Sequence, residues 1–169
     1  MDHGKKFAMT LDYLLGKGAS ANLPRESLTY VLSPRTGGVR TVWLDRRLIG
    51  TLRPDGGVAL TILGAKLLEG SKAFDDNCVT ITGEAVEFVS QGRSVFARHV
   101  RRCGRNISPG GEAIILSPRG EIVAVGRAIL SAKMMRSFKR GVAVKVRQGT
   151  TRAPRAGSPL PGQMEARNA

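Results

Sequence analysis

The amino-acid sequence predicts an α+β protein of two small domains: an antiparallel meander flanked by helices, followed by a mixed β pseudobarrel with short helices. The chain has 169 residues, enough for two small domains and too few for a large multidomain enzyme. Its apolar spacing alternates between the helical and the strand period, which separates the elements. Only short turns divide the strand-like runs, and this favours antiparallel pairing because parallel strands need a longer crossover.

Residues 1–75 form the first predicted domain. A short amphipathic helix is expected over residues 6–16, because Phe7, Leu11, Leu14 and Leu15 share one helical face and glycines follow. The strand-like runs that follow are residues 28–32, 39–44, 47–53 and 58–62. Turn-forming Gly, Pro and Asp residues separate them. A second helical pattern over residues 63–72 completes this α+β unit.

Residues 76–149 form the second predicted domain. The expected strands are residues 79–81, 95–101, 112–117, 122–130 and 142–147. One helix is expected to begin after Thr82 and to end at Gly92, and Ser131 can cap another. Strands interrupted by two short helices favour a closed or partly closed barrel, because closure removes exposed edges. Residues 150–169 contain three prolines and no periodicity, and we expect a disordered basic tail.

The chain is strongly basic, with 27 Lys and Arg against 13 Asp and Glu and a formal net charge of +14. The excess is concentrated in residues 76–149, which hold 13 basic and 5 acidic residues. Lys and Arg that face phosphates release condensed counterions, so polyanions are the first partners to consider. A basic surface that only contacts solvent is the alternative.

Catalytic, metal-binding and cofactor-binding motifs are not found. The Gly16–Ala21 string matches G-x-G-x-x-A, but it follows a helix instead of a strand, which indicates a helix end and not a dinucleotide site. His3 and His99 are the only histidines, and no serine-hydrolase or zinc-deaminase motif accompanies them. Cys78 and Cys103 match no metal spacing, and we expect reduced thiols. With no secretory leader and no membrane-length apolar run, we expect a soluble cytoplasmic protein.

Two groups of residues are candidates for nucleic-acid contact. Gly92, Arg93 and Ser94 combine a helix-ending glycine, a cation and a hydroxyl in one tight turn, where backbone can approach a phosphate. In the last strand, period-2 alternation sends the valines to the core and places Lys145 and Arg147 about 7 Å apart on the opposite face. The same alternation also occurs in a strand whose polar outer face only contacts solvent.

Aromatic residues make up only 5% of the chain, and we assign Phe88, Phe96 and Phe138 to the core. Single-stranded nucleic acid is usually bound by stacking of bases on exposed aromatic side chains. The sequence therefore favours structured RNA, contacted through phosphates, 2′-hydroxyls and a 3′ end, over an extended unpaired strand.

Four segments carry a resemblance to a known family. They are EAVEFVSQGRSVFA at 84–97, SPGGEAII at 108–115, IVAVGRA at 122–128 and GVAVKVR at 141–147. Through these segments, residues 78–149 resemble a PUA domain, the module named for pseudouridine synthases and archaeosine transglycosylases. The preceding part, with TYVLS at 29–33 and VWLD at 42–45, is similar to the region before the PUA domain in archaeal tRNA-guanine transglycosylases. One departure is Gly110-Gly111-Glu112, where many members carry Gly-Asp-Glu.

The resemblance implies a pseudobarrel that holds structured RNA, with tRNA favoured over rRNA. Carried over by position, its RNA-binding residues are Gly92, Arg93, Ser94, Arg98, Lys145 and Arg147. No transglycosylase catalytic domain is recognised in the sequence, so we expect a non-enzymatic archaeal-type protein, acting alone or as the RNA-holding subunit beside a separate catalytic transglycosylase-type chain. The alternatives are a ribosome-associated or translation-initiation module and an RNA-modification enzyme in its own right.

Overall fold

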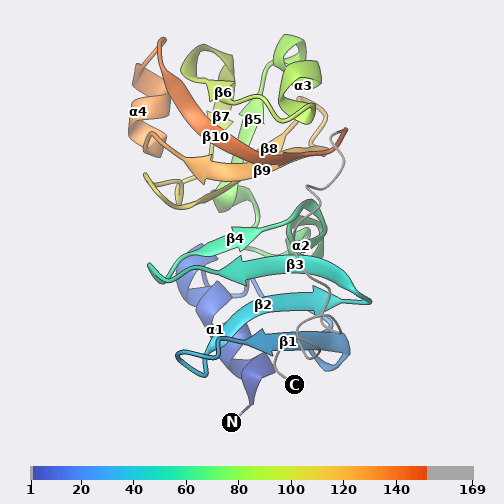
Figure 1. Cartoon of the computed structure of the whole chain (residues 1–169). Coiled ribbons are helices and arrows are strands. Elements are labelled where there is room, and N and C mark those ends of the chain that lie inside the picture. The colour runs from blue at the N-terminus through green and yellow to red at the C-terminus, as the bar shows by residue number, and fades with distance from the viewer. Residues whose placement is uncertain (1, 152–169) are drawn as a thin grey trace.

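The computed structural model describes residues 2–151 and places the two domains end to end (Figure 1). The predicted tail at 150–169 lies, from residue 152 onward, outside the described residues. The first domain is a four-stranded antiparallel sheet in the order β1-β2-β3-β4. Its strands are β1 (Leu28–Leu32), β2 (Val39–Leu44), β3 (Arg47–Leu52) and β4 (Val58–Leu60).

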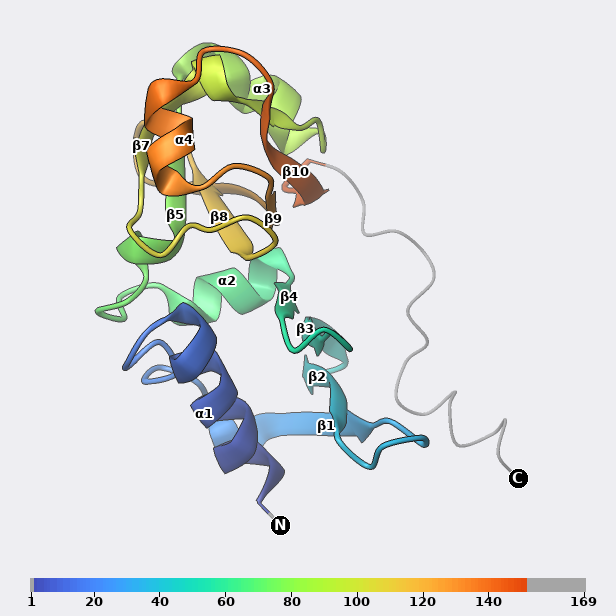
Figure 2. The ribbon, with the colours of Figure 1, turned by 90° about the vertical axis from the view of Figure 1, so that its left-hand side faces the viewer.

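Two helices cover this sheet. Helix α1 (His3–Leu15) begins where the Asp2 carboxylate accepts a hydrogen bond from the Lys5 amide at 3.0 Å, and it ends at Gly16 in the left-handed region. Its buried side chains, Phe7 and Leu11 among them, belong to the core of this domain. Helix α2 (Ile62–Leu68), which Thr61 caps, lies at the end of the sheet next to the second domain (Figure 2).

The second domain is a nearly closed six-stranded sheet in the order β6-β10-β9-β8-β5-β7. Only β5 and β8 pair in parallel, and all other pairs are antiparallel. The strands are β5 (Cys78–Ile81), β6 (Val95–Phe96), β7 (Val100–Cys103), β8 (Glu112–Leu116), β9 (Ile122–Ala128) and β10 (Val142–Gly149). The helices are α3 (Gly83–Ser90) and α4 (Ala132–Ser137). Across both domains, the described residues 2–151 also contain three short 3-10 helices, at Arg25–Ser27, Asp75–Asn77 and Ala97–His99.

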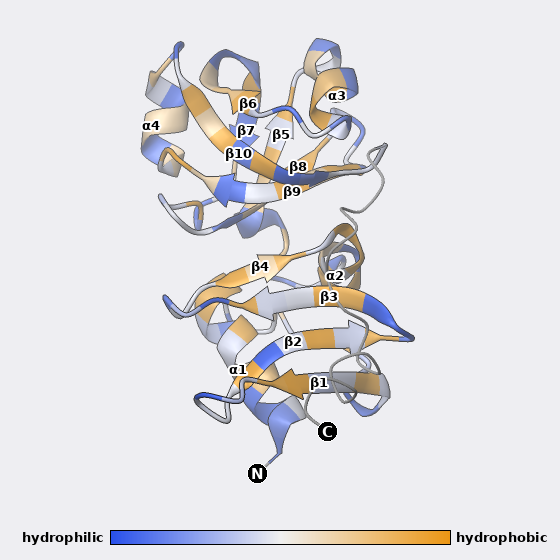
Figure 3. Cartoon of the chain, viewed as in Figure 1, coloured by the Kyte–Doolittle hydropathy of each residue, from blue (hydrophilic) through white to orange (hydrophobic). Residues whose placement is uncertain are grey.

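The expected α+β class and pseudobarrel are confirmed, but two strands differ from the prediction. The expected strand 95–101 is divided into β6 and β7 by the 3-10 helix Ala97–His99, so the chain passes from one edge of the sheet to the other. In β10, register shifts interrupt strict alternation, and Ala143 and Val144 are both buried. Hydrophobic residues, which are orange in Figure 3, occur in the strands of both sheets.

The two domains share an apolar core and a network of polar contacts. Ile114, Leu116, Ile122 and Val125 of the second domain belong to the same buried cluster as the core of the first domain. Strand β4 is the edge of its sheet that faces the second domain (Figure 1). Apolar packing at this seam therefore holds the two domains against each other.

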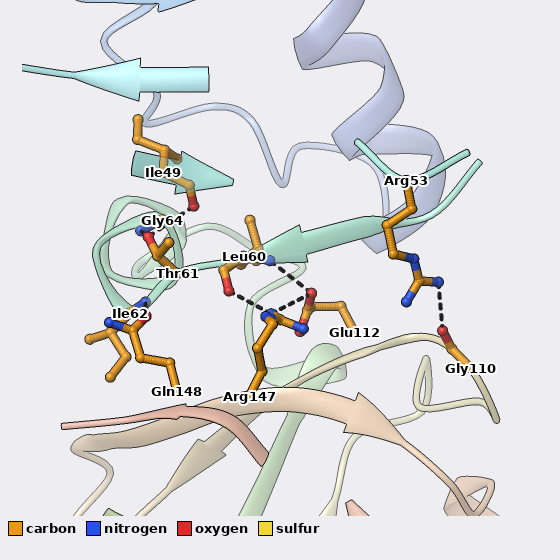
Figure 4. A network of polar contacts seen from close by, with 10 residues as sticks. All are labelled: Ile49, Arg53, Leu60, Thr61, Ile62, Gly64, Gly110, Glu112, Arg147 and Gln148. Atoms are coloured by element: carbon orange, nitrogen blue, oxygen red, sulfur yellow. Dashed lines mark hydrogen bonds and ion pairs between the residues drawn. The ribbon is translucent and has the colours of Figure 1, made fainter. Parts of the chain in front are cut away.

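Glu112 and Arg147 satisfy the backbone amide and carbonyl of Leu60 in this edge strand. The Leu60 amide donates to the Glu112 carboxylate at 2.8 Å, and the Arg147 guanidinium donates to the Leu60 carbonyl (Figure 4). Arg147 and Glu112 are themselves paired at 2.8 Å. Two further contacts cross the seam, from the Arg53 guanidinium to the Gly110 carbonyl at 2.9 Å and from the Ile62 amide to the Gln148 side chain at 2.9 Å.

Candidate nucleic-acid interface

A pocket of about 580 Å³ lies at the end of the second domain that points away from the first. Helix α3, the turn after it, β6 and the 3-10 helix Ala97–His99 supply its walls. The side chains that give it chemical character are Phe88, Arg93, Ser94, Phe96, Arg98 and His99. Its volume lies within the range of pockets that bind small organic molecules. A single nucleobase is small enough to enter it.

The turn after α3 depends on glycine. Gly92 has φ +94°, a conformation that side chains disfavour, and its amide donates to the Val89 carbonyl at 2.9 Å. The next amide, that of Arg93, donates to the Phe88 carbonyl at 3.1 Å. Gly149 at the end of β10 packs against this turn so closely that a Cβ there would overlap the Ser90 carbonyl. The last strand therefore fixes the turn that carries Arg93 and Ser94.

Two phenylalanines expose their rings at the pocket. Phe88 is 51% exposed and Phe96 is 46% exposed, and the Arg93 guanidinium lies 5.7 Å from the centre of the Phe88 ring. The assignment of Phe88, Phe96 and Phe138 to the core is wrong, because all three are exposed: Phe88 and Phe96 lie on short elements, and Phe138 directly follows α4. Exposed rings beside an arginine provide a surface on which a base can stack.

His99 orients Arg98 at the pocket wall. The Arg98 Nε donates to His99 Nε2 at 3.2 Å, so the proton of a neutral ring lies on Nδ1. His99 Nδ1 lies 3.2 Å from the Thr82 hydroxyl and 3.3 Å from the Glu84 carboxylate. Thr82, expected to cap α3, makes no capping hydrogen bond and contacts this ring instead.

The structure separates the predicted contact residues into two sets. Arg93, Ser94 and Arg98 line the pocket, and Gly92 makes its turn. Lys145 is exposed on β10 but does not line the pocket, and in the sheet it is paired with Arg127, which is paired with Glu112. Directly paired residues share a face, so Lys145 lies on the face from which Glu112 contacts the first domain.

Arg147 is not a free outward-facing cation. Arg147 is exposed, as the alternation of β10 predicts, but its guanidinium pairs with Glu112 and contacts the Leu60 carbonyl of the first domain. Burial raises the pKa of the Glu112 carboxyl, while Arg147 and the Leu60 amide act in the opposite direction. Glu112 lies 35 positions away in the chain, and no local pattern of β10 indicates this pair.

The pocket region is poor in acidic residues. Between Phe88 and Gly111 the chain has five arginines and neither Asp nor Glu. Glu84, on the first turn of α3, is the acidic side chain at the pocket, and it is 75% exposed. A groove of this composition favours binding of an anion at this end of the domain.

Other kinds of site were sought among residues 2–151. This part of the chain contains no cluster of three potential metal ligands and no helix long and apolar enough to cross a membrane. Cys78 and Cys103 are free thiols, and burial raises the pKa of both. Neither cysteine is therefore an activated thiolate nucleophile.

Two family models match the chain. The model described as the PUA domain matches residues 77–150. The model described as patch-forming domain C2 of tRNA-guanine transglycosylase matches residues 6–75. These ranges correspond to the two domains of the structure.

Curated relatives agree with these matches. The chain is 32% identical over 146 residues to the tRNA-guanine(15) transglycosylase of Thermoplasma volcanium, and 32% identical over 150 residues to that of Methanothermobacter thermautotrophicus. The alignments cover 86% and 88% of this chain but only 23% of each relative. The chain thus spans about a quarter of the length of these relatives and corresponds to their C-terminal region.

Solved structures support the fold. A hypothetical protein from Pyrococcus horikoshii OT3 superposes with a TM-score of 0.66 at 19% identity, covering 88% of this chain and 90% of that one. A conserved PUA domain protein from Thermoplasma acidophilum gives a TM-score of 0.53 at 21% identity, covering 66% and 70%. These two structures show the fold, and the family matches show that the chain carries a PUA domain preceded by the patch-forming domain C2 of tRNA-guanine transglycosylase.

Proposed function

We propose that this protein binds structured RNA, with tRNA as the favoured target, and serves RNA modification without catalysing a reaction itself. The observation that carries the proposal is the pocket at the outer end of the PUA domain. It combines exposed Phe88 and Phe96 rings with Arg93 and Arg98, in a region without acidic residues from Phe88 to Gly111.

The pocket suggests how RNA is held. An unpaired nucleotide can stack on the exposed rings while the arginines contact the neighbouring phosphates. Helical RNA alone offers no such base, because its bases are stacked and paired. We therefore propose that the target is folded RNA with an accessible unpaired end.

We base the proposed non-catalytic role on the composition of the pocket. Within residues 2–151, His99 contacts Thr82, Glu84 and Arg98, and no hydrogen bond joins it to the Ser94 hydroxyl. The lining of the described pocket therefore shows no hydroxyl paired with a general base. The chain matches about a quarter of its transglycosylase relatives, and we propose that a separate transglycosylase-type chain supplies the catalytic part. We also propose that the protein acts in the cytoplasm.

A competition experiment tests the target. We expect the protein to bind labelled tRNA at moderate salt, and we expect intact tRNA to compete better than the same tRNA trimmed of its unpaired 3′ end. Superior competition by ribosomal RNA fragments would instead support a ribosome-associated role. Absence of binding to either RNA would refute the proposal.

A double substitution tests whether RNA binds at the pocket. We expect Phe88→Ala together with Phe96→Ala to weaken tRNA binding by roughly ten- to a hundredfold, because base stacking contributes about 1–3 kcal/mol per base. Tyr13→Ala is the matched control, since Tyr13 is 89% exposed on α1 and far from the pocket. Equal loss in both variants would show that the pocket is not the binding site.

A further inference from the structure

Helix α1 exposes apolar side chains on the face that points away from the core of its domain. Met9 is 63% exposed and Tyr13 is 89% exposed, whereas Phe7 and Leu11 on the opposite face are buried. Met9 and Tyr13 are four positions apart, so they are neighbours on the surface of the helix. Figure 2 shows α1 along one side of the first domain, next to the sheet. The exposed face is therefore open to another molecule.

The same face lines a hollow of about 590 Å³ on the first domain. The residues of α1 that line this hollow are Lys5, Lys6, Met9, Thr10, Tyr13 and Leu14. Gly56, in the turn between β3 and β4, also lines it. A Cβ at Gly56 would meet no atom within 4 Å, so this turn leaves room for a second element to approach. The hollow can therefore receive a helix from another molecule.

The residues of this face match one another when two copies of α1 run antiparallel. In the register where the numbers of facing residues sum to 19, each of the six lining residues of α1 faces another of the six. The facing pairs are Lys5–Leu14, Lys6–Tyr13 and Met9–Thr10. Asp2, which also lines the hollow, then faces Lys17, and both of these residues are exposed. The face is therefore complementary to a second copy of itself, as a two-fold symmetric interface requires.

The facing pairs are also chemically compatible. In this register the Lys6 ammonium can lie over the face of the partner's Tyr13 ring, and a cation is attracted to that face. The Asp2 carboxylate and the ammonium of the partner's Lys17 have opposite charges. Met9 lies next to the symmetry axis, where its flexible side chain can pack against its own copy. A parallel arrangement would instead place each lysine opposite the same lysine of the partner, and the like charges would repel.

RNA is the other occupant to consider, because three lysines lie at this face. Lys5, Lys6 and Lys17 could contact phosphates, but the negative charge of Asp2 would repel them. A phosphate backbone also offers no apolar partner to Met9. A second copy of α1 accommodates the lysines, the carboxylate and the apolar side chains together, so the observations favour a protein partner of this sequence.

We propose that two copies of this protein associate through α1, packed antiparallel about a two-fold axis. Each copy contributes mainly one helix, so the buried surface lies below that of a standard interface and the association is weak and reversible. The pocket lies at the far end of the second domain (Figure 1), so the dimer leaves both pockets open. The dimer does not depend on the RNA-binding function, because it uses a different domain and a different surface.

Two opposed substitutions test the dimer by sedimentation velocity over a concentration series. Tyr13→Lys places a lysine opposite the partner's Lys6, and Lys6→Glu places a carboxylate opposite the partner's Tyr13 ring. We expect each variant to raise the dissociation constant of the dimer by roughly tenfold, because each change acts at two symmetric contacts. A glutamate near the start of the helix and a lysine near its end both suit the helix dipole, so we expect α1 to remain folded.

A mixture of the two variants provides a sharper readout. In the mixed dimer the introduced lysine faces the introduced glutamate, and the second contact is the unchanged Lys6–Tyr13 pair. We therefore expect an equimolar mixture to associate at least as tightly as wild type, at concentrations where each variant alone is monomeric. Phe138→Lys is the matched control, since it replaces an exposed aromatic ring of the second domain and should leave the dimer unchanged.

A wild-type chain that remains monomeric up to about 1 mM would overturn the proposal. A dimer that Tyr13→Lys and Lys6→Glu leave intact would also overturn it, as would a mixture that fails to associate. If Lys6→Glu instead weakened the binding of tRNA to a monomeric chain, the face would contact RNA and the dimer would be refuted. None of these results bears on the pocket, which the Phe88→Ala and Phe96→Ala variant tests separately.

Discussion

Two regions of the PUA domain carry arginines that look alike in the sequence and differ in the structure. At the outer end, Arg93 and Arg98 lie at an open pocket with exposed aromatic rings. At the seam between the domains, Arg147 is paired with a carboxylate that is only 2% exposed, and it contacts the backbone of the other domain. The role of an arginine is thus decided by the partner that the fold brings within reach. Loss of each residue should therefore affect a different property.

The largest expected effect is on stability at the seam. Arg147→Ala leaves the Glu112 carboxylate buried without its cation, and we expect the free energy of unfolding at neutral pH to fall by about 3 kcal/mol. Urea denaturation measures this change. Lys145→Ala, on the same strand but outside the pair with Glu112, should change stability by no more than about 0.5 kcal/mol. Equal effects of the two substitutions would show that the pair does not stabilise the seam.

A second substitution should restore part of this loss. Glu112→Gln in the Arg147→Ala background removes the buried charge and keeps an oxygen that can accept from the Leu60 amide. We expect it to recover about 1–2 kcal/mol of the lost stability, because the uncompensated charge accounts for much of the cost. A double variant that is less stable than Arg147→Ala would contradict this explanation.

At the pocket the expected effect is on binding. Arg93→Ala should weaken RNA affinity by about five- to tenfold, through loss of a phosphate contact and of its contact with the Phe88 ring. Its free energy of unfolding should change by no more than about 0.5 kcal/mol, since Arg93 is exposed. Filter binding across a salt series provides the affinity. A large loss of stability with unchanged affinity would reverse the comparison between the two regions.

The smallest expected effect is on the pH dependence of stability. Burial raises the pKa of Glu112 above the ordinary glutamate value of 4.5. The folded chain then binds more protons than the unfolded chain just above pH 4.5, so this carboxyl makes stability decrease as pH rises through that window. Glu112→Gln should remove this contribution. Identical pH profiles for the two proteins between mildly acidic and neutral pH would disprove it.

The sequence predicted the elements well, because they depend on local periodicity and on turn residues. All four strands of the first sheet occur where apolar alternation indicated them, and Gly92 ends α3 as expected. The candidate turn also lies at a pocket, since a glycine between a helix and a strand creates an exposed backbone corner. The RNA-binding role of these residues and of Lys145 stays a prediction.

The sequence does not predict the contacts or the exposure of side chains whose surroundings come from distant parts of the chain. Arg147 and Glu112 meet only after β8, β9 and β10 align, and Leu60 of the other domain completes the set. The sequence predicts Phe88 and Phe96 in the core because apolar side chains usually belong there, yet their elements are too short to be covered on both sides. Spacing along one strand contains no information about these contacts.

The contacts at Leu60 have a further consequence for assembly. An edge strand exposes amide and carbonyl groups that can recruit a strand from another molecule. At Leu60 of β4, a carboxylate and a guanidinium occupy the positions that a neighbouring strand would use, so this edge is closed to strand addition at that residue. The opposite edge of the sheet is β1. Loss of the Glu112–Arg147 pair would free these groups of β4 for intermolecular pairing, and resistance to aggregation would decline together with stability.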